Sequence, residues 1–185
     1  MIGDSIINYF NLAYTFLGFY GPYLLFVSSF FLLYNKNVLL GYYLFGFFFN
    51  ILANFFLKNI IKQPRPEHPD KPSLYDNNAI NKIINSFKES QGKLQTYGMP
   101  SKHMQLCFYS IVFMFFALRS HKYLPLIMLT YLGVSIVTAF QRVSSYDHSP
   151  FQVAVGCIVG AIIGYGLYNM TVSRLNGKIL PKIHF

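Results

Sequence analysis

The fold is decided by the stretch VLLGYYLFGFFFNILANFFL, residues 38–57, which carries no charged side chain along its length. An α-helix needs about 20 mostly apolar residues to cross the hydrocarbon core of a bilayer. Within lipid, a helix satisfies its own backbone polar groups, whereas an irregular chain does not. We therefore expect a transmembrane helix over residues 38–57.

Further apolar stretches on both sides predict an all-α integral membrane protein. They cover residues 6–33, 104–118, 123–140 and 151–168. Gly21-Pro22 interrupts the first stretch, and each half alone is too short to cross, so we expect one long, kinked helix rather than a hairpin. The expectation is a single domain, residues 1–185, folded as a bundle of about five transmembrane helices.

The composition excludes an ordinary soluble domain. Hydrophobic residues make up 54% of the chain and charged residues only 11%, against about 25% charged residues in soluble proteins. The formal charge of +9 is spread along the chain, and no nucleic-acid-reading motif accompanies it, so nucleic acid is not an expected partner. We therefore expect the chain to lie in a lipid bilayer.

A polar insertion, about residues 66–99, separates the second expected span from the third. Prolines at its start, within QPRPEHP (63–69), prevent a continuous helix. Residues 79–88 carry apolar side chains at helical spacing. This pattern fits an amphipathic helix on the membrane surface or a solvated helix within the loop.

Three short polar islands lie at the ends of apolar stretches and carry residues suited to phosphate. The expected alternation of spans places all three on the same membrane face. Arginine offers a planar fork for phosphate oxygens, lysine a point charge, and serine a further donor. The islands are Lys58 with Arg65-Pro66, Pro100-Ser101-Lys102-His103, and Arg142 with His148.

Two histidines among these cations indicate phosphoryl chemistry. Histidine acts as a nucleophile or as a proton donor near neutral pH. One of His103 and His148 would attack phosphorus and the other would protonate the leaving oxygen. The residues alone do not assign the two roles.

The distribution of charge gives an expected sidedness. The loops on the face opposite the islands carry basic residues and no acid, which is typical of a cytoplasmic face. The islands would then face the lumenal or exoplasmic side, with the C-terminus in the cytoplasm. The basic residues on the opposite face are Lys36, Arg119, Lys122, Arg174, Lys178 and Lys182.

The spacing of the islands resembles the type-2 phosphatidic acid phosphatase superfamily. Its first motif is a lysine, six residues and Arg-Pro, here KNIIKQPRP (58–66). Its second is Pro-Ser-Gly-His, here PSKH (100–103). Its third is Ser-Arg, five residues, a histidine, three residues and an aspartate, here QRVSSYDHSPFQ (141–152).

A narrower resemblance points to the dolichyl-diphosphatase branch. That branch reads Tyr-Gly-Met-Pro-Ser-Ser-His, a polar residue and Gln, and this chain has YGMPSKHMQ at 97–105. The branch also has glutamine in place of the aspartate, followed by a glycine-rich helix, and this chain has Gln152 followed by Gly156, Gly160 and Gly164.

The resemblance implies a role for each matching residue. His148 would be the nucleophile that forms a phosphohistidine, His103 the acid and then the base, and Gln152 the residue that orients His148. The resemblance also implies a core like that of vanadium haloperoxidases, with no metal and no cofactor. The phosphoryl group would be held by Lys58, Arg65, Ser101 and Arg142.

The implied activity is hydrolysis of a polyisoprenyl diphosphate, a phosphorylated lipid, to the monophosphate and phosphate. The site would lie in an endoplasmic-reticulum-type or a viral membrane; the sequence does not specify an oligomeric state. Two positions depart from the pattern: Lys102, which could bind a second phosphate, and Gln141, which replaces the serine. They leave two alternatives open, a phosphatase of other lipids such as phosphatidate and an inactive structural protein. Asp147 is expected to be a helix-start residue.

Overall fold

The computed structural model describes residues 2–66 and 97–176. Five α-helices make up nearly all of this described part, and the sequence prediction of an all-α membrane fold is confirmed. The expected surface helix at 79–88 lies outside the described residues. The helices are α1 (Ile2–Leu33), α2 (Asn37–Ile61), α4 (Lys102–Ala117), α5 (Leu124–Ser144) and α6 (Pro150–Asn176).

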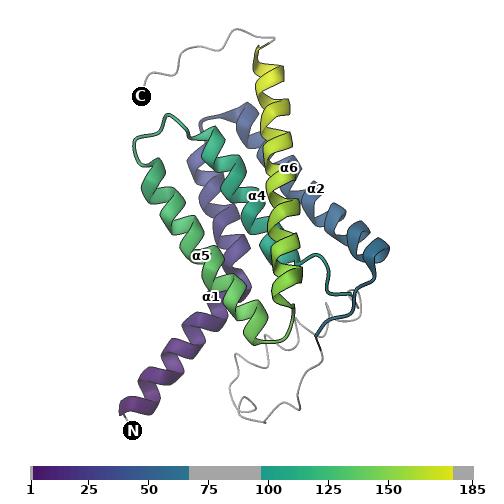
Figure 1. The fold of residues 1–185 in the computed structure, drawn as a ribbon. Coiled ribbons are helices and arrows are strands. Elements are labelled where there is room, and N and C mark those ends of the chain that lie inside the picture. The colour runs from purple at the N-terminus through teal and green to yellow at the C-terminus, as the bar shows by residue number, and fades with distance from the viewer. Residues whose placement is uncertain (1, 67–96, 177–185) are drawn as a thin grey trace.

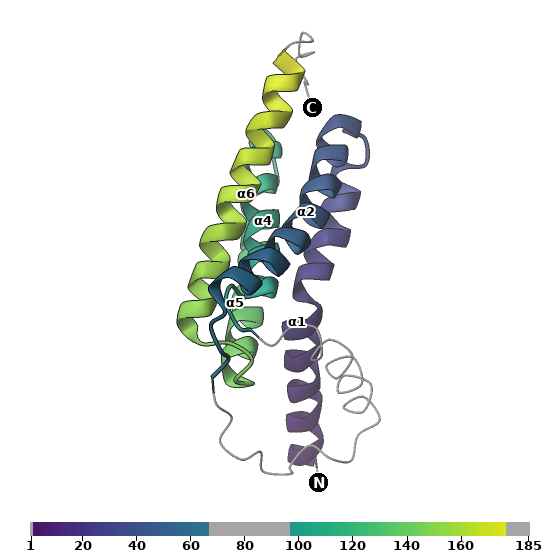
Figure 2. The same cartoon turned by 90° about the vertical axis from the view of Figure 1, so that its right-hand side faces the viewer.

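The helices alternate in direction, so that two helices end and two begin at one end of the bundle. Figures 1 and 2 show the end of α2, the start of α4, the end of α5 and the start of α6 at this end, which we call the site end. The N-terminal part of α1 lies on the same side. This arrangement agrees with the alternation expected from the apolar stretches.

Four of the helices are long and apolar enough to cross a membrane. The exception is α4, which corresponds to the expected span 104–118, has 16 residues and is buried along most of its length. It contacts all four of the other described helices. The expected bundle of about five helices is confirmed, with four long helices packed around a short central one. The four candidate spans are Tyr9–Leu33, Asn37–Ile61, Leu124–Ser144 and Pro150–Leu175.

Three helices extend past their expected C-terminal ends, which are residues 57, 140 and 168. The expected ends stop at or near polar residues, but Lys58, Arg142 and Arg174 lie in the last turns of α2, α5 and α6. A basic side chain is favourable there, because the helix dipole places partial negative charge at the C-terminal end. Two cations of the candidate site are therefore fixed by helical backbone.

Close packing of α6 on α4 depends on glycine. Glycines spaced four residues apart on α6 face α4 residues with the same spacing, and a Cβ at Gly160 would lie only 2.1 Å from the carbonyl oxygen of Gln105. Small residues let helix backbones approach closely where lipid supplies no hydrophobic drive between helices. The facing pairs are Gly156 with Ser101, Gly160 with Gln105 and Gly164 with Tyr109.

The first apolar stretch forms one continuous helix, α1, with Pro22 inside it. The hairpin alternative is therefore wrong. Figure 1 shows that α1 bends and that its N-terminal part projects beyond the other helices at the site end. Polar contacts attach its other half to α5: the hydroxyls of Ser28 and Ser29 each lie 2.9 Å from that of Tyr131.

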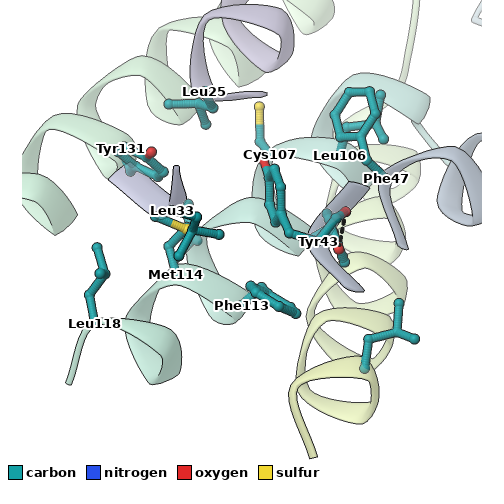
Figure 3. Packing of buried hydrophobic residues seen from close by; sticks show 13 residues of the cluster. Leu25, Leu33, Tyr43, Phe47, Leu106, Cys107, Phe113, Met114, Leu118 and Tyr131 are labelled. Atoms are coloured by element: carbon teal, nitrogen blue, oxygen red, sulfur yellow. Dashed lines mark hydrogen bonds between the residues drawn. The ribbon is translucent and has the colours of Figure 1, made fainter. Parts of the chain in front are cut away.

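The apolar core lies between the helices away from the site end (Figure 3). Tyr43 of α2 stacks on Tyr109 of α4 with ring centroids 5.4 Å apart. The Tyr109 hydroxyl donates to the Tyr43 carbonyl over 2.8 Å. Outside the bundle, large apolar side chains are exposed, as expected of a surface facing lipid. Examples are Phe31, Phe45, Phe48, Leu129 and Ile162.

Candidate active site

The sequence-predicted site residues all lie on the segments that meet at the site end. Lys58 is in the last turn of α2, and Arg65 follows shortly after that helix. Ser101, Lys102 and His103 begin α4, Arg142 is in the last turn of α5, and His148 precedes α6. Buried members of the set include Lys58, Ser101, His103, Arg142, His148 and Gln152.

The amide of Gln152 contacts the imidazole of His148. Its Oε1 lies 3.3 Å from Nδ1 of His148, and both side chains are buried. The same Oε1 accepts a hydrogen bond from the Ser149 backbone N–H at 3.2 Å. On the other side of the amide, Nε2 donates to the Pro64 carbonyl at 2.8 Å.

These partners determine which nitrogen of His148 carries the proton. The amide cannot be reversed, because its nitrogen is needed to donate to the Pro64 carbonyl and its oxygen is needed to accept from Ser149. The atom facing His148 is thus an acceptor, so Nδ1 of a neutral imidazole is the donor. Its other nitrogen, Nε2, keeps its lone pair. In this tautomer His148 can act as a nucleophile through Nε2.

The start of α6 keeps His148 next to the helix through a capping box. The Ser149 hydroxyl accepts from the Gln152 backbone N–H at 3.2 Å, while the Gln152 side chain accepts from the Ser149 N–H at 3.2 Å. This reciprocal pairing satisfies two N–H groups that a helix start leaves without partners. Pro150, which has no N–H to satisfy, occupies the first helical position.

Gln152 also connects the first two sequence motifs. Its Nε2 contacts the side chain of Gln63 at 3.2 Å as well as Pro64, and its carbonyl accepts from the Ser101 N–H at 3.1 Å. A Cβ at Gly98 would lie 2.5 Å from its Oε1, so only glycine leaves room for the amide. One partner, His148, is expected for Gln152 from the sequence, whereas the structure shows several.

Asp147 bridges two of the predicted phosphate-binding arginines. Its Oδ1 lies 3.5 Å from Nη1 of Arg65 and its Oδ2 lies 3.4 Å from Nη1 of Arg142. The expectation that Asp147 starts a helix is wrong, because α6 begins at Pro150 and the carboxylate is occupied by the arginines. Sequence spacing could not show this, since the two arginines come from different motifs.

Buried donors without a hydrogen-bond partner among the described residues occur at the site end, and they include Oγ of Ser101 and Nη2 of Arg142. Ser101 is the N-cap of α4, where a serine usually accepts from the helix start, yet its side chain makes no such bond. A buried donor without a partner is destabilising by about 1–3 kcal/mol. Both donors are therefore suited to an anion that enters the site.

The surroundings of His148 lower its pKa to about 3. Burial is the largest cause, and the positive charges of Lys58, Arg65 and Arg142 add to it. The carboxylate of Asp147 opposes this shift. His148 is consequently neutral at physiological pH. Electrostatic interactions also connect Lys102 with Arg65 and Arg142, and His103 with His148.

A group of buried amides below the site was not predicted from the sequence. The side chain of Asn54 donates to the Pro100 carbonyl at 3.1 Å and to Oε1 of Gln105 at 2.7 Å. Gln105 in turn donates to Oδ1 of Asn50. Asn50, Asn54 and Lys58 recur every four residues on one face of α2. This spacing in an apolar helix was the signal that could have revealed them.

Within residues 2–66 and 97–176, no group of three or more His, Cys, Asp or Glu side chains is placed to hold a metal ion. The charge available to a bound anion comes instead from the lysines and arginines described above.

Comparison with known proteins relates this arrangement to an established family. A family model described as PAP2 superfamily matches residues 39–175. Dolichyldiphosphatase 1 from Dictyostelium discoideum is 30% identical over 145 residues, which cover 75% of this chain and 55% of that protein. The chain thus spans about half the length of this relative. No solved structure shows significant similarity to the chain.

Proposed function

The chain belongs to the PAP2 superfamily, and from this premise we propose that it is a membrane lipid phosphatase acting on a polyisoprenyl diphosphate. The reaction would release orthophosphate and leave the lipid monophosphate. The likeness to a protein named dolichyldiphosphatase supports a dolichyl-type substrate. The alternatives are other lipid phosphates, such as phosphatidate, and an inactive protein.

One observation carries the proposal: Nε2 of His148 keeps its lone pair at the end of the bundle where buried donors have no hydrogen-bond partner among the described residues. The Gln152 amide holds the proton on Nδ1. The unpartnered donors, Ser101 Oγ and Arg142 Nη2, are buried at the same end of the bundle. Fixed donors beside a nucleophile can stabilise the charge that develops on a phosphoryl group under attack.

In the first step, Nε2 of His148 attacks the terminal phosphorus of the diphosphate. A nitrogen–phosphorus bond forms and the bond from phosphorus to the bridging oxygen breaks. The lipid monophosphate leaves with that oxygen, which takes a proton from His103. Burial and the charges of Arg142 and Lys102 lower the pKa of His103 in the free chain, so the mechanism requires the bound diphosphate anion to stabilise its protonated imidazole. Gln152 accepts a hydrogen bond from Nδ1–H throughout and so stabilises the positive imidazole ring of the phosphohistidine, although less than a carboxylate would.

In the second step, water attacks the phosphohistidine. His103, now neutral, takes one proton from the water, and the nitrogen–phosphorus bond breaks to release orthophosphate. The starting protonation of both histidines is thereby restored. Lys58, Arg65, Ser101 and Arg142 would hold the equatorial oxygens through both steps. The proposal assigns no step to a metal ion or a cofactor.

The number of cations favours a diphosphate over a single phosphate. Lys102 adds a fourth positive side chain to Lys58, Arg65 and Arg142, and it interacts electrostatically with both arginines. We assign Lys102 to the phosphate that stays on the lipid, because the other cations are needed at the phosphorus that is attacked.

The site would face the lumen of an endoplasmic-reticulum-type membrane, with the C-terminus in the cytoplasm. The support is the distribution of basic residues, since the loops opposite the site end contain Lys36, Arg119 and Lys122 without acids. A protease-protection experiment with a C-terminal tag would test this orientation.

The experiment that tests the proposed function compares substrates and a nucleophile variant. The purified full chain in detergent is given dolichyl diphosphate or phosphatidate, and released phosphate is measured. We expect preferential hydrolysis of dolichyl diphosphate and loss of turnover in His148→Ala. Faster hydrolysis of phosphatidate would select the first alternative. Full activity in His148→Ala would exclude the mechanism, and absence of both turnover and thermal stabilisation by vanadate would select the inactive protein.

A further inference from the structure

We propose that α1 and Gln141 position Arg142 for the phosphoryl group, although α1 lies before residue 39, where the family match begins. Gln141 acts through a hydrogen bond, and α1 acts through Gly18 and Phe19. All are positioning residues, since none is assigned a contact with substrate. The functional consequence rests on the proposed function, but the geometry of Arg142 does not.

The first part of this arrangement is a hydrogen bond between the neighbouring side chains of Gln141 and Arg142. Oε1 of Gln141 accepts a hydrogen bond from Nε of Arg142 at 2.7 Å, and both residues are buried. A hydrogen bond to a charged donor in a buried setting is among the stronger ones. The serine that the family pattern has before this arginine carries no amide oxygen that could accept the same bond.

The second part is contributed by α1. The Phe19 ring lies under the guanidinium of Arg142, with 5.6 Å between Cζ and the ring centroid, a distance at which cations and aromatic faces attract. The same ring lies 5.8 Å from that of His103. Phe19 therefore contacts side chains of two different motifs, and it is itself buried.

The third part explains why α1 can approach so closely. A Cβ at Gly18 would lie 2.3 Å from both Cβ and Cγ of Gln141 and 2.9 Å from its Cδ. Real Cβ atoms do not come so near, so glycine at position 18 leaves room for the long Gln141 side chain. A larger residue would have to push α1 and α5 apart.

Together these contacts occupy every part of the Arg142 guanidinium except Nη2 and one face. Guanidinium donors form a rigid planar fork. Gln141 fixes Nε, Asp147 lies 3.4 Å from Nη1, and Phe19 covers one face of the plane. Nη2 remains without a hydrogen-bond partner among the described residues. We infer that Nη2 is the donor that these contacts hold in place to bind the anion.

The test observes the Arg142 Nε proton directly. The full chain, labelled with ¹⁵N-arginine and held in detergent, gives one Nε–H signal per arginine, and Arg142→Lys identifies the signal of interest. We expect slow exchange of this proton in the wild type. Exchange should rise about tenfold or more in Gln141→Met, which keeps the volume and loses the acceptor, and should stay slow in Gln141→Glu, which keeps an acceptor. Equal exchange in wild type and Gln141→Met would overturn the proposal.

A second variant covers the case in which Gln141→Met does not fold. Gly18→Ala should also raise the exchange rate, because it displaces Gln141. The matched control is Gly133→Ala in α5, where an added Cβ meets nothing within 4 Å. If Gly18→Ala folds and leaves the exchange rate unchanged, α1 has no positioning role.

Binding of inorganic phosphate and orthovanadate, followed by thermal shift, gives the functional readout. Gln141→Met and Gly18→Ala should weaken binding about tenfold, the scale of one hydrogen bond to a charged group. Gly133→Ala should not weaken it. If the wild type binds neither anion while the exchange results hold, the proposed function fails and the positioning of Arg142 stands. If binding is unchanged in a variant whose exchange rises, Arg142 is not positioned for phosphate.

Discussion

Gly156 of α6 lies against the backbone of Ser101, the N-cap of α4, where a Cβ on the glycine would be 2.6 Å from the Ser101 carbonyl oxygen. The contact belongs both to the helix packing and to the candidate site, because the buried Ser101 hydroxyl has no hydrogen-bond partner in the described part of the chain. The distance between α4 and α6 thus determines the distance between Ser101 and His148. Packing and phosphate binding should respond to the same substitution.

Gly156→Ala should therefore lower both stability and anion binding. The added methyl group meets backbone, which cannot rotate away, and overpacking of this kind costs about 1–3 kcal/mol. Thermal unfolding with and without vanadate measures the two effects. The control is Gly166→Ala on the same helix, which meets nothing within 4 Å and should be neutral or stabilising, since alanine favours helix. Equal behaviour of the two variants would contradict the packing argument.

Gln152→Met should reduce turnover more than it weakens substrate binding. The variant keeps the length of the side chain but removes the acceptor that holds the proton on Nδ1 of His148. We expect kcat to fall about ten- to hundredfold, the effect of one hydrogen bond to a charged group. Steady-state kinetics on dolichyl diphosphate would measure it.

The control for Gln152→Met is Ser149→Ala. It removes the hydroxyl that caps α6 and leaves the Gln152 side chain and its contact with His148 in place. Its stability should fall by about 1 kcal/mol, with kcat nearly unchanged. A similar loss of kcat in both variants would show that Gln152 acts through the helix start rather than through the histidine.

Much of the fold followed from the apolar stretches, because crossing a bilayer imposes length and composition on each helix. The convergence of Lys58, Ser101 and His148 followed from alternation of the spans alone. Other contacts did not follow, because they depend on distances between helices that hydrophobic patterning leaves open. Asp147 joins arginines from two motifs, and Phe19 reaches the site from a helix that precedes all three motifs. The central position of α4, in contact with the four other described helices, was not predicted for the same reason.

Stability should fall as the pH is lowered from about 6.5, in part because of His148. Unfolded histidine has a pKa of about 6.5, whereas burial and the charges of Lys58, Arg65 and Arg142 lower it to about 3 in the folded chain. Between these values the unfolded chain binds a proton that the folded chain does not, so acid favours unfolding. Thermal unfolding at pH 7, 6 and 5 measures the slope.

His148→Asn should flatten this slope by up to about 1.4 kcal/mol per pH unit, the value for one proton. His121→Asn provides the matched control, since His121 lies in the connection between α4 and α5, at the opposite end of the bundle. It should leave the slope as in the wild type. If His148→Asn shows the wild-type slope, His148 takes up its proton in the folded chain as readily as in the unfolded one.

Turnover should survive removal of metal ions. In the proposed mechanism, the cations that hold the phosphoryl group are Lys58, Arg65 and Arg142, which chelators do not remove. Dialysis against EDTA should change kcat on dolichyl diphosphate by less than about twofold, well below the effect expected for a Lewis-acidic metal. Loss of activity that is restored by one added divalent cation would require a different mechanism.

Asn54→Leu should destabilise the chain and weaken anion binding, although Asn54 does not belong to any of the three motifs. The variant removes the donor to the Pro100 carbonyl and to Gln105, and leaves both acceptors buried without that partner, at about 1–3 kcal/mol for such a group. Because Pro100 immediately precedes Ser101, the turn that places Ser101 should lose its support from α2. Asn59→Leu is the control, since Asn59 is exposed and its amide donates within its own helix, to the Phe55 carbonyl. We expect thermal stability and vanadate binding to fall in Asn54→Leu and to stay near wild type in Asn59→Leu.

A stable Asn54→Leu variant that binds vanadate normally would show that the buried amides serve packing in the membrane and do not support the site.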